Sequence, residues 1–451
     1  MPPLPTGWAI IQRYSHRVRE LSILPFSQFT PLFLQATSLH PSQLLPNLKA
    51  LEWSPECDQP SLPIIFIRQL LGPSLVSLSV NLDDLDDVTS RSFLANYPSF
   101  CPNLKTILIQ NGEHVRSSQK TTELVSQSLI RFEDLQSFHI HIPINDVALM
   151  HVVMSPKLKK LSLILHPDIS NLHRVLIPSD TIPFRNAEHV SLEVWDIHFV
   201  TTLLRTREQM FHAFILRHNS RPTIEVASAL VTALVSPPRS RSLRSIRFMP
   251  GHLDEKRVTS VELDEFTMRN QLSYDSLRPL SSLRQLRQLD LDLGLCFSLD
   301  DDELVSLTRN WPLLEDLRLT CEQPIHGHPW RSAKYVTFKG LLSLLQCCPE
   351  LRQLSLPVDA RVVPIDTGDI ICNPALTYIH FHESPISKLD PVIDFFARHF
   401  PSVTKVRALF GAMSGEWDRE VEWYYLLWVG VNARLQGVYL TIPDEYPSLG
   451  E

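Results

Sequence analysis

A short apolar phrase recurs along the chain and constrains its fold more than any other feature of the sequence. Each copy has an apolar residue, two variable residues, a second apolar residue, one variable residue and a third apolar residue, often after Pro-Asn or Cys-Pro. The clear copies are Leu48-Leu51-Trp53, Leu75-Leu78-Val80, Leu104-Ile107-Ile109, Leu135-Phe138-Ile140, Leu158-Leu161-Leu163, Leu243-Ile246-Phe248, Leu286-Leu289-Leu291, Leu314-Leu317-Leu319, Leu351-Leu354-Leu356 and Leu376-Ile379-Phe381. The weaker copies are Val18-Leu21-Ile23, Ala187-Val190-Leu192, Phe211-Phe214-Leu216 and Val403-Val406-Ala408. Most copies begin roughly 23 to 32 residues after the previous one, a spacing typical of a repeat protein.

The spacing inside and between these phrases predicts one strand and one helix per repeat. The last two apolar residues of a phrase lie two apart, so they point to the same face of a strand. Between phrases the apolar spacing changes to three and four, which is the period of a helix. Such helical stripes are Ile64, Ile67, Leu70 and Leu71, then Leu341, Leu344 and Leu345, and finally Val392, Phe395 and Phe396. The carboxylates at 300–302 precede Leu304 and Leu307, where they can cap a helix.

We therefore expect an α/β fold, a leucine-rich-repeat solenoid of about 13 to 14 degenerate repeats. A curved parallel sheet would form its concave face, and helices would cover its convex face. The alternative is a helical protein that is merely rich in leucine. Such a protein would not place an alternating motif after Pro-Asn so regularly.

The composition agrees with a repeat protein and argues against several functional classes. About one residue in six is leucine, and the chain has 35 Pro but only 13 Gly, few for loops that cradle phosphates or dinucleotides. The net charge of -7 argues against a general nucleic-acid binder. Seven scattered cysteines match neither a disulfide framework nor a zinc site. We expect no cofactor and no metal.

The sequence shows no signal for export or membrane insertion. The segment Met1–Pro5 lacks the charged and apolar regions of a secretory signal. The most apolar run, Trp423–Val431, has nine residues, about half of the ~20 that span a bilayer. We expect a chain without membrane contact that resides in the cytoplasm, the nucleus or both.

The repeats divide the chain into three regions. Residues 1–17 form an N-terminal cap segment, residues 18–415 the solenoid, and residues 416–451 a C-terminal capping helix and tail. The capping helix carries a stripe of Trp417, Val421, Tyr424, Trp428, Val431 and Leu435. Insertions near 250–275, 322–335 and 358–372 follow strands, so we expect them at one edge of the solenoid. They mark either a binding edge or neutral loop growth.

The segment Gly7–Leu21 carries a family resemblance. Its Trp, spaced Tyr and Arg-Val-Arg-x-Leu pattern is made by Trp8, Tyr14, Arg17, Val18, Arg19 and Leu21. This pattern resembles the segment after the F-box in the F-box/leucine-rich-repeat proteins of mushroom-forming fungi. The Pro-Asn-Leu-Lys repeats and the Trp-rich terminal helix are similar to that family too, so the resemblance covers nearly the whole chain.

The resemblance implies the substrate-recognition arm of a Skp-cullin-F-box ubiquitin ligase, with a Skp-family adaptor and a cullin as partners if an F-box lies upstream. The helical F-box itself is not found before Trp8. Leu4-Pro5 has no room behind it, and Leu24-Pro25-Phe26 lies where the first repeat needs its own helix. The sequence is therefore either truncated or derived from a protein that lost this connection.

Candidate contact residues are those that point away from the core on the concave strands. They are His139, His141, Arg247, Asp290, Asp292, Arg318, His380 and His382, to which Trp330 on an inserted loop is added as an anchor. The two His-x-His pairs indicate metal binding or pH-sensitive recognition, or else simply a polar strand face, which we favour because no third ligand accompanies them. The arginines and aspartates on successive strands can pair with each other as readily as with a ligand.

No motif for catalysis is found. The chain has no phosphate-binding glycine loop, nucleophile elbow, His-Glu-x-x-His sequence or paired-cysteine zinc cluster. We therefore expect a non-catalytic protein, monomeric outside its complex, that binds target proteins on its concave face. The alternatives are a stand-alone scaffold without a ubiquitin-ligase connection and a receptor for a small ligand.

Overall fold

The computed structural model describes residues 13–23, 43–54, 64–82, 88–111, 118–165, 184–205, 211–235, 242–251, 271–321, 334–364, 371–408 and 419–440. The chain forms two compact units, Met1–Trp195 and Asp196–Glu451. Each unit is built from parallel strands that follow one another in chain order and from helices that connect them.

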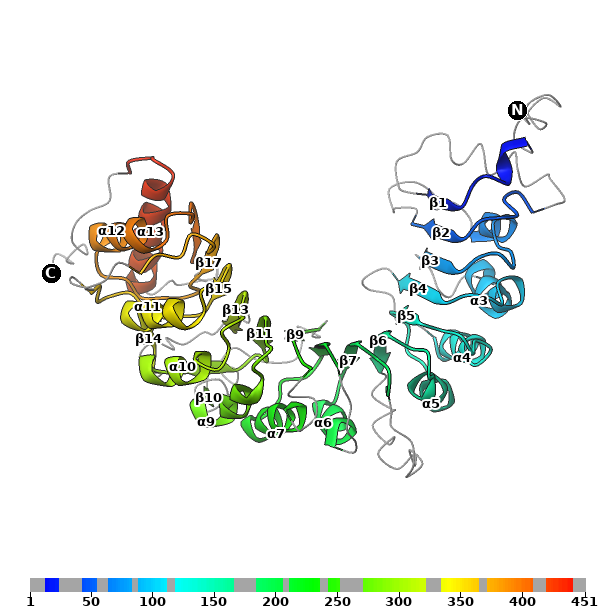
Figure 1. Cartoon of the computed structure of the whole chain (residues 1–451), viewed down its shortest axis with the longest axis horizontal. Coiled ribbons are helices and arrows are strands. Elements are labelled where there is room, and N and C mark those ends of the chain that lie inside the picture. The colour runs from blue at the N-terminus through cyan, green and yellow to red at the C-terminus, as the bar shows by residue number, and fades with distance from the viewer. Residues whose placement is uncertain are drawn as a thin grey trace. The chain divides into compact units, whose positions relative to one another are not determined.

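The described residues of unit 1 contain seven parallel strands. They are β1 (Glu20–Ile23), β2 (Ala50–Trp53), β3 (Ser77–Leu82), β4 (Thr106–Asn111), β5 (Ser137–Ile140), β6 (Lys160–Leu165) and β7 (His189–Val194). Its helices are the 3-10 helix η1 (Ile64–Gln69), α3 (Val88–Phe100), α4 (Gln119–Leu129) and α5 (Asp146–Met154). The α-helices all cover the same face of the sheet (Figure 1).

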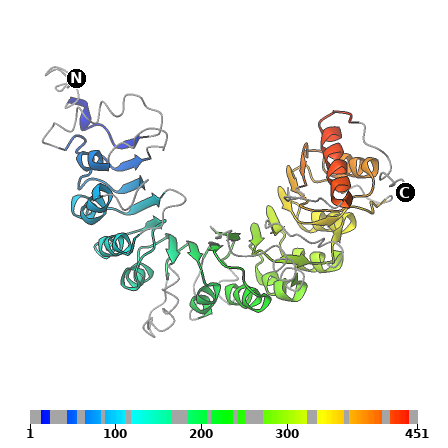
Figure 2. The ribbon, with the colours of Figure 1, turned by 180° about the vertical axis from the view of Figure 1, so that it is seen from behind.

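The described residues of unit 2 repeat this arrangement with seven further parallel strands. They are β8 (Ala213–His218), β9 (Ser245–Pro250), β11 (Gln288–Asp292), β13 (Asp316–Thr320), β15 (Gln353–Ser355), β17 (Tyr378–His380) and β18 (Val406–Arg407). Its helices are α6 (Ile197–Arg205), α7 (Ile224–Leu234), α9 (Tyr274–Leu277), the 3-10 helix η4 (Arg278–Ser282), α10 (Asp301–Thr308), α11 (Phe338–Cys347), α12 (Leu389–His399) and α13 (Arg419–Leu435). Seen from behind, the helices of this unit again lie on one side of its strands (Figure 2).

Every one of the recurring phrases coincides with one of these strands, so the predicted α/β leucine-rich-repeat solenoid is confirmed. Equivalent apolar residues lie side by side in the register, as Leu78, Ile107, Phe138 and Leu161 do on β3 to β6. All four are at most 3% exposed. The register of the strands therefore places equivalent apolar side chains next to one another, and these form one continuous core within each unit.

The predicted helical stripes form the inner faces of helices. Leu341, Leu344 and Leu345 are buried on α11, while Ile67 and Leu70 lie buried at a 3-10 helix rather than an α-helix. Asp300 begins α10 with a capping box, in which its side chain accepts from the Glu303 N–H at 2.9 Å and the Glu303 carboxylate accepts from the Asp300 N–H at 3.0 Å. The box satisfies backbone donors that the helix itself leaves unpaired.

The inserted stretches and segments beside them contribute to two separate two-stranded parallel sheets. Strand β10 (Gln271–Ser273) pairs with β12 (Cys296–Ser298), and β14 (Val336–Thr337) pairs with β16 (Val358–Asp359). At the start of the insertion expected near 358–372, Val358 and Ala360 are fully buried. Most of the other inserted residues lie outside the described residues.

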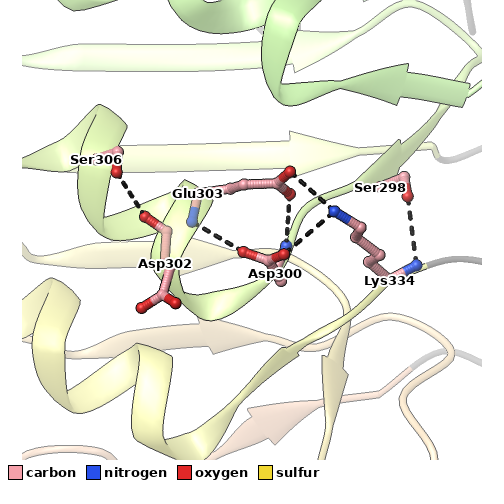
Figure 3. Close-up of polar contacts among 6 residues, drawn as sticks. All are labelled: Ser298, Asp300, Asp302, Glu303, Ser306 and Lys334. Atoms are coloured by element: carbon pink, nitrogen blue, oxygen red, sulfur yellow. Dashed lines mark hydrogen bonds and ion pairs between the residues drawn. The ribbon is translucent and has the colours of Figure 1, made fainter.

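Lys334 fastens the end of one insertion to helix α10. Its ammonium group donates to Asp300 at 3.2 Å and to Glu303 at 2.9 Å, and its backbone N–H donates to the Ser298 hydroxyl at 3.3 Å (Figure 3). All three groups are at the surface, so the ion pairs position the segment more than they stabilise the fold.

Helix α13 closes unit 2. Trp428 is 1% exposed, donates from Nε1 to the Ser384 carbonyl at 2.8 Å and packs on Phe381. The Asn432 side chain accepts from the backbone N–H of Val406 at 2.7 Å, which occupies a donor of the last strand. Among the described residues, no helix has the length and apolarity that a membrane crossing requires.

Candidate functional site

The open face, the sheet face opposite the helices, carries a row of polar side chains in unit 2. The variable residue between the second and third apolar residues of each phrase points to this face, and the register places these residues next to one another across six strands. In order from β9 to β18 the row is Arg247, Asp290, Arg318, Ser355, His380 and Arg407. From Arg247 to His380, the residues directly before and after each member of the row are buried apolar residues.

A second row, two residues earlier on each of β9, β11, β13 and β15, is joined by hydrogen bonds. Ser245 donates to Gln288 at 2.8 Å, and Gln288 donates to Asp316 at 3.0 Å. Arg318 Nε donates to the same Asp316 at 3.1 Å, and its Nη2 donates to Gln353. This chain of contacts holds the Arg318 guanidinium in place, because two of its five N–H donors are used within the protein.

Three of the predicted contact residues are buried, which corrects the expectation of an exposed face. Asp290, Asp292 and His380 are only 8%, 3% and 6% exposed. Arg247 and Arg318 flank Asp290 on the adjacent strands, where long side chains can cover a short one.

Asp292 has a structural task. Its carboxylate accepts from the Gly294 N–H at 3.1 Å, and its carbonyl lies 2.9 Å from Nε2 of the buried His218. Gly294 has a φ of 65°, a left-handed conformation that glycine adopts without strain. Asp292 thus shapes the turn after β11 rather than offering a contact surface.

His380 and His382 form a stacked pair at the end of β17. Their ring centroids are 3.8 Å apart, and His382 Nε2 lies 2.8 Å from the Ser355 hydroxyl. Burial and the charges of Arg407 and Arg318 lower the pKa of His380 to about 4. Burial and His380 hold the pKa of His382 well below its ordinary value. Both rings are therefore neutral near pH 7, and the pair does not switch charge there.

His380 leaves one polar atom unused. Within the part of the chain that the structure describes, its buried Nε2 has no hydrogen-bond partner. A buried polar atom without a partner costs free energy, which an external ligand can recover.

Two residues of this region were missed in the sequence. The Tyr378 ring lies below both Arg318 and Arg407, whose guanidinium carbons are 5.9 and 5.6 Å from its centroid. Arg407 occupies the same position in its phrase as the other members of the row, so the alternation could have predicted it. It was missed because its phrase, the last one, is a weak copy. Tyr378 precedes the second apolar residue of its phrase, a position from which no candidate contact residue was predicted.

In unit 1 the predicted histidine pair also exists. His139 Nε2 and His141 Nε2 are 2.7 Å apart, and both side chains are half-buried. The register places Leu108 and Ser162 beside His139. No group of three or more metal-ligating side chains is present among the described residues. Trp330, the predicted anchor, lies outside the described residues.

No family model matches the chain, and no curated protein matches it. Among solved structures it is similar to the leucine-rich-repeat ectodomain of the receptor kinase GASSHO1/SCHENGEN3 from Arabidopsis thaliana in complex with CASPARIAN STRIP INTEGRITY FACTOR 2, with 14% identity and a TM-score of 0.36. That similarity covers 87% of this chain and 41% of the Arabidopsis chain, so the chain spans less than half of its length.

Two further structures are similar to this chain at 13% and 12% identity. The yeast Rad7 and Elc1 complex has a TM-score of 0.40, and the similarity covers 90% of this chain and 84% of that chain. The mouse RP105/MD-1 complex has a TM-score of 0.26, and the similarity covers 77% of this chain and 60% of that chain. The leucine-rich-repeat fold rests on the chain's own repeats and on the register of its strands.

Proposed function

We propose that this chain is a protein-interaction module that binds a partner protein on the open face of unit 2. The observation that carries the proposal is the polar row from Arg247 to Arg407, which lies in register across six strands of a face that the helices do not cover. Arginine and tyrosine concentrate binding energy at protein interfaces, and both residue types occur here. A sheet of adjacent repeats provides the broad surface that such binding needs.

We further propose that the module is the substrate-recognition arm of a Skp-cullin-F-box ubiquitin ligase. The resemblance of the Gly7–Leu21 segment supports this role. In such a complex the receptor contributes proximity, since it holds the target close to a reactive group on another subunit. This chain would therefore need no catalytic residue and no cofactor of its own.

The test is affinity purification of the tagged chain from its own cells, followed by mass spectrometry. Arg247, Arg318 and Arg407 are replaced together by Gln, and Arg309→Gln with Arg398→Gln, both exposed on the helical side, serves as the control. We expect partners to be recovered with the wild type and the control but lost with the open-face variant. Equal recovery with all three chains would contradict binding on this face.

The same experiment separates the ligase from a scaffold. Recovery of a Skp-family adaptor and a cullin supports the ligase arm. Recovery of one stoichiometric partner without either contradicts the ligase role and leaves a stand-alone binding protein.

A further inference from the structure

The open face of unit 2 carries a local excess of positive charge toward β18. On the strands before it, Asp290 lies between Arg247 and Arg318, and Asp316 pairs with Arg318. Beyond Arg318 the row continues with Ser355, the neutral His380 and Arg407. The cations at the start of the row thus have acidic neighbours, whereas the last one has none in the row.

Arg407 is free to bind a ligand. It is exposed, and its side chain makes no ion pair or hydrogen bond with the described residues. The contact that does orient it is with the Tyr378 ring at 5.6 Å. A guanidinium on an aromatic face keeps its N–H edge available for a planar oxygen pair.

Arg318 approaches the same ring from its own strand. Its guanidinium carbon is 5.9 Å from the Tyr378 centroid, and its side chain remains 34% exposed. Asp316 and Gln353 occupy two of its N–H donors and leave the others available. Both guanidinium groups contact the Tyr378 ring, and the register places His380 directly beside Arg407, so the three groups belong to one stretch of the open face.

His380 indicates a ligand at the same place, independently of the two arginines. The residue is only 6% exposed, yet its Nε2 atom has no hydrogen-bond partner among the described residues. A neutral imidazole can place an N–H on this nitrogen and donate to an anion without adding to the positive charge.

We propose that Arg318, Arg407 and His380 form a carboxylate-binding site, which an acidic side chain of the partner protein fills. Two cations attract the negative charge, and the arginine forks and the imidazole N–H match the oxygen acceptors of an Asp or Glu side chain. The inference rests on the proposed function for the statement that the ligand belongs to a protein. The site itself is defined by the geometry of this chain.

The experiment uses the purified full chain and fluorescently labelled poly-L-glutamate, with binding measured by fluorescence anisotropy at low salt. We expect Arg407→Gln to weaken binding ~10-fold, the loss expected for one charge-assisted contact. Arg398→Gln, which removes an equal charge from the exposed face of α12, should leave affinity within about twofold. Equal losses in the two variants would mean nonspecific attraction and overturn the site.

A second readout locates the ligand. The imidazole signal of His380, assigned by comparison with His380→Gln, should move in NMR spectra when poly-L-glutamate is added to the wild type, but not when it is added to Arg407→Gln. An unmoved His380 signal would overturn the proposal. Because this test needs no cellular partner, a failure of the purification experiment and a failure of the carboxylate site are distinguished.

Discussion

At the scale of single residues, the open face shows how neighbours decide what a histidine can do. His380 lies between the cations Arg318 and Arg407, and its ring stacks on His382. The two nearby positive charges and the burial of the ring both disfavour its protonated form. Its surroundings therefore keep it neutral and make it a hydrogen-bonding group instead of a charge.

This arrangement predicts acid sensitivity. The pKa of His380 is about 4 in the folded chain against 6.5 for an ordinary histidine, so as pH falls from 6.5 toward 4 the unfolded chain takes up a proton that the folded chain excludes. The free energy of unfolding should fall by about 3 kcal/mol over this range. The lowered pKa values of His382 and His218 act in the same direction.

Urea denaturation at several pH values measures this effect. His380→Gln should flatten the pH dependence below pH 6.5. A His380→Gln chain with the full wild-type slope would show that other groups control the acid sensitivity.

At the scale of elements, helices α10 and α11 are joined by one carboxylate. Asp301 on α10 accepts from the backbone N–H and the hydroxyl of Thr337, both at 2.7 Å, and Thr337 is the residue that caps α11. Gly340 on α11 lies against this contact. A Cβ atom added there would be 2.2 Å from Asp301 Oδ1 and 2.9 Å from Val336 Cγ1.

Helix propensity alone predicts that Gly340→Ala stabilises the chain by about 1 kcal/mol. The structure predicts the opposite sign. The new methyl group must displace the Asp301 carboxylate from Thr337, so we expect a net loss of about 1–3 kcal/mol in the free energy of unfolding.

Chemical denaturation checks this prediction. The exposed Gln346→Ala on the same helix is the matched control and should change stability by less than about 0.5 kcal/mol. Stabilisation by Gly340→Ala would show that the two helices separate at little cost.

At the scale of the whole molecule, the stability of each repeat depends on the repeats next to it. In such arrays a terminal unit covers the last apolar surface. Helix α13 does so for unit 2 through Trp428, which contacts Phe381 and Ser384, and through Asn432, which contacts Val406.

Removing the Trp428 side chain should therefore act locally. We expect Trp428→Ala to cost about 3–5 kcal/mol, the loss typical of a large cavity. Hydrogen exchange, followed by mass spectrometry, should accelerate in β17 and β18 but stay unchanged in β3 to β6. Tyr425→Ala, on the exposed side of α13, is the control. Uniform acceleration along the chain would mean that the molecule unfolds as one cooperative body.

The repeat architecture could be predicted from the amino-acid sequence, because each phrase encodes its own strand and the apolar positions alone decide which side faces the core. Even weak copies such as Val403-Val406-Ala408 form strands. The same alternation assigned His139, Arg247 and Arg318 to the open face. The Asp300 cap followed from local chemistry as well.

What those open-face residues can bind depends on contacts between strands that are far apart in the sequence. Burial of Asp290 and His380 depends on long side chains from adjacent strands, which lie 27 or more residues away in the sequence. The approach of Arg318 and Arg407 to Tyr378 joins side chains from separate strands for the same reason. Alternation within one strand says which way a side chain points, whereas its exposure, its partners and its pKa are set by residues that only folding brings beside it.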